Sequence, residues 1–269
     1  MPDRPEIISL LGTAHYATPA TGEALAKLET ELEQAAAELS AAPEDLERQI
    51  LVGRRLAYLW RYHEAIAVFS RALEQQPLHP ALLRHRGHRL ISIRRLGAAV
   101  RDLTQANAAQ PGDFDILYHL GLARWLTGDH AGAVEAYQAY LHHCTDDEER
   151  VALTYWLHLS LWRAGDQTAA QDILARTGSP TVTENAHYLH LLELFGGRRS
   201  QAQVEETAGQ DDLAAGTLGF GLGCWHLMGG RTEAAMASFQ SVTSGRYWPA
   251  FGFIAAEVEL ARLTGLLPA

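Results

Sequence analysis

The residues best suited to chemistry in this sequence are arginines and histidines that cluster between positions 84 and 101. They are Arg84, Arg86, Arg89, Arg94, Arg95 and Arg101, together with His85 and His88. No Asp or Glu occurs between Glu74 and Asp102. Guanidinium groups bind carboxylates and phosphates through paired hydrogen bonds, and histidine can carry protons near neutral pH. The segment therefore indicates a place where an anion is bound.

Two other kinds of chemistry are less well supported by the same residues. His85 and His88 could form a metal site with His119, but the neighbouring arginines would repel a divalent cation. Apart from Asp115, no carboxylate or thiol stands at a ligand spacing, so we expect neither a metal nor another cofactor. Histidine, tyrosine and arginine facing one cavity could support acid–base catalysis. Because the sequence has no GxSxG, HExxH, Walker or Rossmann signature, the expectation leans away from an enzyme.

Composition sets the class of protein in which this basic segment must work. The chain has 269 residues, of which 47% are hydrophobic and 20% charged, so it can bury a large core. Its 32 acidic and 22 basic residues give a formal net charge of −10. Phosphate-rich partners are bound mainly by clusters of cations, so we expect no nucleic acid and no anionic membrane surface as partner.

The cysteines and the apolar stretches indicate a cytoplasmic protein. Cys144 and Cys224 form neither a CxxC pair nor a disulfide framework. The N-terminus lacks a basic segment followed by a long apolar one, so no signal peptide is expected. The longest uncharged stretch, Ala214 to Gly230, is too short and too rich in glycine for a comfortable membrane span.

An internal repeat of 34 residues supplies the elements that must position the basic segment. The repeated positions are Gly53, Gly87 and Gly121, then Ala65, Ala99 and Ala133, then Phe69, Leu103 and Tyr137. Each unit reads as two helices, which in the first unit run from Leu46 to Tyr58 and from His63 to Gln75, before Pro77. Small residues at the first two positions would let the paired helices cross closely.

The helix pairs resemble the tetratricopeptide repeat (TPR) superfamily. The stretch from Tyr62 to Leu73 and the later Pro77 are close to the family pattern for the second helix. The same pattern continues at Tyr118-His119-Leu120-Gly121 and Gly128-Asp129-His130, and more weakly to the end of the chain. The resemblance implies an all-α fold, a right-handed α-solenoid of about six TPR-like helix pairs with N- and C-terminal capping helices. The order of elements is similar to uncharacterised stand-alone bacterial TPR proteins, from which no activity is carried over.

The register of the repeat predicts the organisation of the whole chain. Residues 1–22 are expected to be irregular, residues 23–45 to form an N-terminal capping helix and residues 248–269 a C-terminal one. The TPR-like repeats between them are expected at 46–79, 80–113, 114–147, 151–182, 183–215 and 216–247. Within the last segment, Trp248 to Leu263 reads as an amphipathic helix that ends near Gly265 and Pro268.

In TPR proteins the first helix of each pair lines the concave face, which implies a set of candidate ligand-binding residues. They are Arg54, Tyr58, Arg84, His85, His88, Tyr118, His119, Tyr155, Trp156 and His187. Their aromatic members suit stacking and cation–π contacts, but could equally cover the thin inner wall of a solenoid. Arg54, Arg84 and His88 match part of the cluster with which TPR modules grip peptide C-termini, although the usual Asn and Lys are missing.

Arg86 raises a separate question because it stands at a packing position that is Val or Leu in other units. A guanidinium buried there requires a partner, since an unpaired buried charge costs several kcal/mol. The candidates are Glu47, Asp115 or the anion of a ligand.

Two functional hypotheses follow. In the first, the protein is an interaction scaffold whose concave groove binds a peptide or partner segment through an anionic group. In the second, it is a small-molecule-binding or catalytic TPR protein that acts on an anionic metabolite. An open, extended groove favours the first, and a pocket closed by the segment from Leu10 to Tyr16 favours the second. Self-association through the solenoid ends or the convex face is a third possibility.

Overall fold

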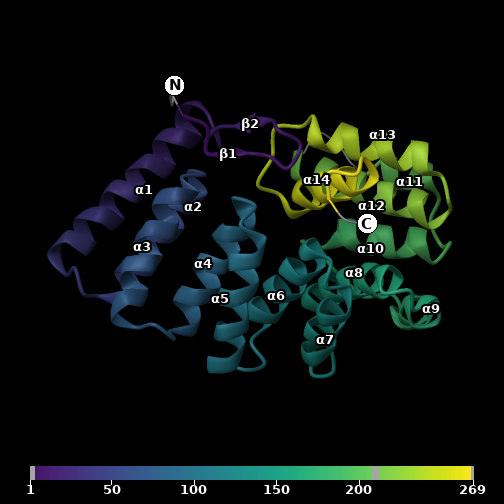
Figure 1. The fold of residues 1–269 in the computed structure, drawn as a ribbon, viewed down its shortest axis with the longest axis horizontal. Helices are drawn as coiled ribbons and strands as arrows, with labels where there is room; N and C mark the ends of the chain where they lie inside the picture. The colour runs from purple at the N-terminus through teal and green to yellow at the C-terminus, as the bar shows by residue number, and fades with distance from the viewer. Residues whose placement is uncertain (1–3, 208–211, 268–269) are drawn as a thin grey trace. The chain divides into compact units, whose positions relative to one another are not determined.

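A computed structural model describes residues 4–207 and 212–267 of the chain, and these residues form fourteen helices and one pair of short strands (Figure 1). The strands are β1 (Ile7–Ile8) and β2 (Ala14–His15). The helices are α1 (Gly22–Ala41), α2 (Leu46–Tyr58), α3 (Tyr62–Gln75), α4 (Pro80–Ser92), α5 (Leu96–Ala109), α6 (Phe114–Thr127), α7 (His130–Leu141), α8 (Asp147–Arg163), α9 (Gln167–Arg176), α10 (Ala186–Phe195), α11 (Gln201–Glu205), α12 (Asp212–Met228), α13 (Thr232–Thr243) and α14 (Phe251–Leu263). The expected all-α fold of helical repeats is confirmed.

Small residues allow the two helices of each repeat to cross closely, as the repeat predicted. A Cβ atom built on Gly53 of α2 would lie only 2.3 Å from the Phe69 ring of α3. The same glycine faces Leu103 at 2.7 Å in the second repeat and Tyr137 at 2.5 Å in the third. The large partner residue is fully buried each time. The same close helix crossing therefore recurs every 34 residues along the chain.

The described residues fall into two compact units, residues 1–119 and 120–269. Unit 1 holds the strands, α1 to α5 and the first part of α6. Its N-terminal segment, expected to be irregular, contains a small antiparallel ladder in which Ile7 pairs with His15 and Ile8 with Ala14. Glu6 ties this ladder to α3, because its carboxylate accepts a hydrogen bond of 2.7 Å from the backbone N–H of His63.

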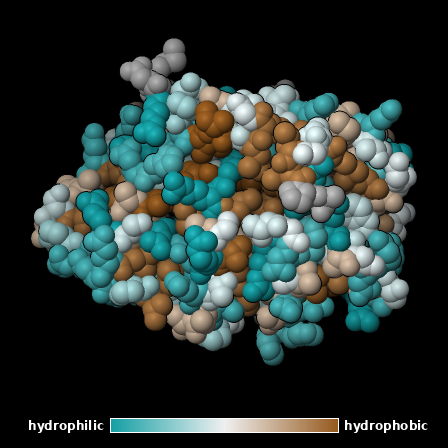
Figure 2. Space-filling model, viewed as in Figure 1, coloured by the Kyte–Doolittle hydropathy of each residue, from teal (hydrophilic) through white to brown (hydrophobic). Residues whose placement is uncertain are grey.

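The helix α1 begins unit 1 as a mostly polar element. Only Ala35 of its residues is fully buried, whereas Leu25, Leu28, Leu32 and Leu39 are half-buried along the face toward the repeats. In Figure 2 the surface over this end of unit 1 is largely hydrophilic. One apolar face and one charged face are what a helix at the end of a repeat stack needs.

The last helix of unit 2 departs from the prediction. The segment from Trp248 to Leu263 was expected to be an amphipathic cap, but every residue of α14 from Gly252 to Ala261 is buried. Even Glu257 and Glu259 are 0% exposed. The expected amphipathic character is wrong because α14 has no exposed face between Gly252 and Ala261, and its role as a cap stays a prediction.

Three short stretches lie outside the described residues. They are residues 1–3, residues 208–211 in the expected fifth repeat, and residues 268–269. The helix stop expected at Pro268 and the first residues of the expected irregular segment therefore fall outside the description. The repeat boundaries themselves stay a prediction.

Candidate functional site

The helices α2 and α4, with one residue each from α3 and α6, line a pocket of about 460 Å³ in unit 1. It is lined by Arg54, Ala57, Tyr58, Phe69, Arg84, His85, His88, Arg89 and Asp115. Five of the ten predicted ligand-binding residues therefore line one cavity. Arg89 and Asp115 line it as well, although neither was among the ten.

The arginines of this pocket are held differently from one another. The guanidinium of Arg84 pairs with the carboxylate of Asp115 at 3.3 Å, and the Asp115 side chain is 50% exposed. Arg54 is exposed, and within residues 4–207 and 212–267 its Nη2 has only a long contact of 3.4 Å to the hydroxyl of Tyr58. Arg89 stacks on the Tyr62 ring, 5.4 Å from its centroid. With three arginines and one aspartate, the pocket carries an excess of positive charge.

Burial keeps the pocket histidines neutral at pH 7. Burial, reinforced by Arg84 and Arg54, lowers the pKa of His85 to about 3. Burial likewise places the pKa of His88 well below its usual range. Burial also lowers the pKa of Arg89 to about 10, so this guanidinium stays protonated. The positive charge of the pocket therefore comes from arginine, while the imidazoles offer neutral hydrogen-bonding groups.

Aromatic contacts fix the two pocket histidines in place. The ring of His85 stacks on Phe69, with centroids 5.5 Å apart. The ring of His88 lies 4.2 Å from that of His119. The Nδ1 atom of His119 is 2.5 Å from the backbone oxygen of Asp115, and burial lowers the pKa of His119 to about 4. His119 therefore packs against the ring of His88 and does not line the pocket itself.

A second hollow continues from this pocket along α2. It has a volume of about 350 Å³ and is lined by Asp45, Glu47, Arg48, Ile50, Leu51 and Arg54. Arg54 lines both hollows. Together they follow α2 over nearly its whole length, so this face of unit 1 is an elongated groove with Arg54 in the middle.

Arg86 has a partner, but not one of those expected. Its Nε and Nη2 atoms donate to the two carboxylate oxygens of Asp102 at 2.6 and 2.9 Å, and its Nη1 donates to Ser70 Oγ at 3.2 Å. The proposed partners Glu47 and Asp115 are therefore wrong. Asp102 stands on α5, the second helix of the same repeat, and faces Arg86, whose position is occupied by Val or Leu in other units.

The remaining predicted residues do not join the pocket. Tyr118 packs beside it against Phe114, with ring centroids 5.6 Å apart. Tyr155 and Trp156 of unit 2 are 0% exposed, which contradicts a role in contacting a ligand. Tyr155 stacks on Tyr188 at 4.6 Å and Trp156 on Phe220 at 5.7 Å. They are core residues, the alternative that the sequence left open for inner-wall aromatics.

The structure places His187 in unit 2, outside the residues that line the unit 1 pocket. It is half-buried on α10, and its ring meets that of His190 edge-on, with centroids 6.3 Å apart. A binding role for His187 stays a prediction.

The helix α14 explains why the inner face of unit 2 is closed. Glu259 forms ion pairs with Arg163 of α8 and, at 3.1 Å, with Arg262 of its own helix. The guanidinium of Arg262 reaches the backbone oxygens of Trp125 and Leu126 at 3.5 Å each. Trp125, Leu126 and Arg163 all stand on α6 and α8, first helices of their repeats and therefore expected to line the groove. The chain's own last helix covers these positions, whereas the groove of unit 1 is open.

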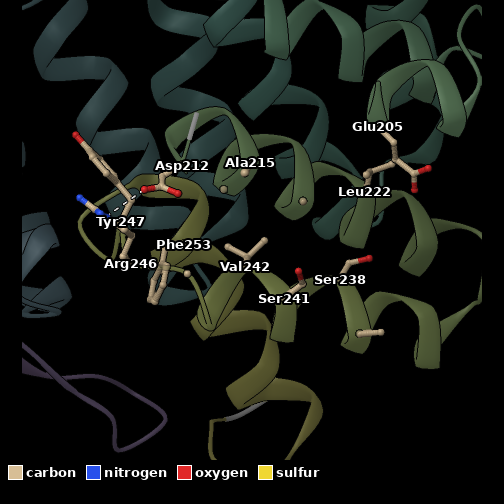
Figure 3. A pocket seen from close by; sticks show the side chains of 14 residues that line it. Glu205, Asp212, Ala215, Leu222, Ser238, Ser241, Val242, Arg246, Tyr247 and Phe253 are labelled. Carbon is tan, nitrogen blue, oxygen red and sulfur yellow. Dashed lines mark ion pairs between the residues drawn. The ribbon is translucent and has the colours of Figure 1, made fainter. Parts of the chain in front are cut away.

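Unit 2 has another hollow of about 390 Å³ between α12, α13 and α14 (Figure 3). Its walls are mainly small residues, such as Gly216 and Gly219 of α12 and Ser238 and Ser241 of α13. The ion pair between Asp212 and Arg246 at 3.2 Å marks one end, far from Glu205 at the other. Asp212 neutralises Arg246 and leaves Glu205 as the remaining charge, so the hollow lacks the excess positive charge of the unit 1 pocket.

The described ranges also bear on metals and membranes. Within residues 4–207 and 212–267, no three His, Cys, Asp or Glu side chains are grouped so that they could hold a metal ion. Among the helices described, none is long and apolar enough to cross a membrane.

Comparison with known proteins supports the repeat assignment. Residues 86–149 match the tetratricopeptide repeat family model. No curated protein matches the chain. A tetratricopeptide repeat protein from Parabacteroides merdae ATCC 43184 superposes with a TM-score of 0.54 at 16% identity, covering 87% of this chain and 92% of that one. This likeness supports the fold. The resemblance to TPR proteins is thus confirmed for the second and third repeats.

Two further solved structures are similar at lower scores. YrrB, described as a TPR protein with an unusual peptide-binding site, gives a TM-score of 0.48 at 14% identity, covering 88% of this chain and all of that one. The structure of Naa15/Naa10 bound to HypK-THB gives 0.43 at 13% identity, with 81% of this chain and 34% of that one covered.

Proposed function

We propose that the protein is an interaction scaffold and that the groove of unit 1 binds a peptide or partner segment through an anionic group. The observation that carries the proposal is the exposed guanidinium of Arg54, which has a long contact to Tyr58 and lies in one pocket with Arg84 and Arg89. Guanidinium groups bind carboxylates in paired hydrogen bonds worth more than neutral ones. A carboxylate of the partner would therefore complete the site.

The shape of the groove supports a peptide over a metabolite. The pocket and the hollow beside it share Arg54 and extend along α2, as an extended segment requires. Beyond the arginines, Ile50 and Leu51 offer apolar contacts and Glu47 an exposed carboxylate. Within the described residues, nothing from Leu10 to Tyr16 lines the pocket, although such a wall was the feature expected of a metabolite site.

Asp115 sets the strength of the site. Its carboxylate already neutralises part of the charge of Arg84, so a ligand anion must compete with it. Its side chain is nevertheless 50% exposed, which lets Arg84 turn toward a ligand at small cost. Removal of this carboxylate should therefore strengthen the binding of an anion, the opposite of the effect of removing an arginine.

The test starts from a library of fluorescent hexapeptides with free carboxyl termini and its amidated counterpart. For the tightest peptide, Arg54→Ala and Arg84→Ala should each weaken binding about ten-fold or more, since a charge-assisted hydrogen bond contributes about 1.5–3 kcal/mol. Asp115→Asn should tighten it. Arg71→Ala, which removes an exposed arginine of α3 outside the groove, is the matched control. Equal affinities for all four variants, or equal selection of peptides without any anionic group, would refute the proposal.

A further inference from the structure

A fourth hollow, on unit 2, combines an apolar floor with a basic mouth. It has a volume of about 290 Å³ and lies between the carboxyl ends of α7 and α9 and the first half of α8. Its floor is Val151, Thr154 and Leu157, which are 1%, 4% and 1% exposed. Leu141 and Ile173 form apolar walls. An engineered cavity of about 150 Å³ holds benzene, so this one can accept a ring or a chain of several carbons.

The charged side chains that line this hollow are both arginines. His142, Arg150 and Arg176 line its mouth, and no Asp or Glu is among its ten lining residues. Arg150 pairs with Asp147, whose second carboxylate oxygen accepts the backbone N–H of Thr181 at 3.1 Å. In the described part of the chain no carboxylate pairs with Arg176. On a protein of net charge −10, such a mouth selects an anion.

We infer that this hollow binds a small amphiphilic carboxylate, with its apolar chain or ring on Val151 and Leu157 and its carboxylate at Arg176 and Arg150. The apolar floor distinguishes this ligand from an inorganic anion, which would leave those side chains in contact with water. The basic mouth distinguishes it from a neutral hydrocarbon. The inference is independent of the unit 1 groove, since the two sites share no residue.

Helix ends provide a competing role for the same basic groups. His142 follows the last residue of α7, and Arg176 is the last residue of α9. Basic side chains at such positions stabilise the helix through its dipole. In that role, Arg176→Ala would lower thermal stability and leave the affinity for carboxylates unchanged. In the proposed role, it lowers the affinity.

Calorimetric titration of the full-length protein with octanoate tests the inference. Octanoate should bind, octylamine should not, and butyrate should bind at least ten-fold more weakly, because each buried methylene contributes to the affinity. Arg176→Ala should weaken octanoate at least ten-fold, whereas Arg71→Ala in unit 1 should not. Thr154→Leu, which fills the floor, should abolish binding while circular dichroism remains that of the wild type.

Several results would overturn the inference. Absence of saturable octanoate binding to the wild type would do so, as would equal affinity for octylamine. An unchanged affinity in Arg176→Ala would assign that residue to the helix end alone, and Arg176→Ala remains informative even if Thr154→Leu does not fold. Competition between octanoate and the peptide selected for unit 1 would place the carboxylate in the wrong pocket.

Discussion

A single methyl group at Gly53 should reveal how tightly the helices of a repeat are packed. In an unobstructed helix, replacing Gly by Ala stabilises a protein by about 1 kcal/mol. At Gly53 the added Cβ would lie 2.3 Å from Phe69 Cε1, and Phe69 is only 1% exposed. The ring must retreat by more than an ångström within a full core, so the cost should be near the upper end of the roughly 1–3 kcal/mol known for overpacking.

The net effect of Gly53→Ala is therefore a loss of about 2 kcal/mol, or about 4–8 °C in Tm for a chain of this size. Gly216→Ala is the matched control, because Gly216 is also inside a helix but a Cβ there would meet nothing within 4 Å. It should raise stability by about 0.5–1 kcal/mol. Urea unfolding followed by far-UV circular dichroism measures both.

A double variant tests the cause of the loss. Gly53→Ala combined with Phe69→Leu should lose less than the sum of the single changes, since the smaller side chain gives the methyl group room. The second repeat already uses leucine opposite its glycine, at Leu103. If Gly53→Ala proved as stable as the wild type, or if the losses were simply additive, the steric explanation of the 34-residue spacing would be refuted.

Three further predictions concern charges. Arg86→Leu removes the partner of the Asp102 carboxylate, whose side chain is only 10% exposed. Urea unfolding should show that the free energy of unfolding falls by about 3 kcal/mol and is largely recovered when Asp102→Ala is added. Glu259→Gln should lower the free energy of unfolding by about 3–5 kcal/mol, because Arg262 loses its buried partner. The tryptophan fluorescence of unit 2 measures this change, and a decrease of less than about 1 kcal/mol would contradict the prediction. Burial lowers the pKa of His85 to about 3. Between about pH 6.5 and 3 the unfolded state therefore binds more protons than the folded state, and the free energy of unfolding falls as the pH falls. His85→Gln should flatten this fall by about 1.4 kcal/mol per pH unit, and an unaltered slope would argue against a buried neutral His85.

Much of the fold could be predicted from the sequence because each repeat is a local unit. Gly53 and Phe69 are only sixteen residues apart, so the spacing of small and large side chains reports directly on their contact. The bounds of α2 agree with the prediction for the same reason. The sequence also predicted that Arg86 requires a buried partner, because it replaces an aliphatic residue at a packing position. The partner was missed because Asp102 stands on α5, the second helix of the repeat, whereas the expected partners Glu47 and Asp115 stand on first helices.

The closed inner face of unit 2 could not be predicted in this way. The contact of Arg262 with the end of α6 joins residues 137 positions apart along the chain. A local register assigns Tyr155 and Trp156 to a groove but says nothing about a helix that returns to cover it. The two buried glutamates of α14 were the available signal. Glu257 and Glu259 are two positions apart and therefore lie on nearly opposite sides of the helix, so they do not form the single polar face that a terminal cap requires.

The binding role of the unit 1 groove is tested most directly by the NMR signals of histidine rings during titration with the tightest carboxyl-terminal peptide. His85 and His88 line the pocket, so their ring signals should shift and saturate, and Arg54→Ala should move the midpoint to higher peptide concentration. His158, 2% exposed in the core of unit 2, is the internal reference and should not move. Peptide binding that leaves His85 and His88 unshifted would contradict the assignment of this groove as the site.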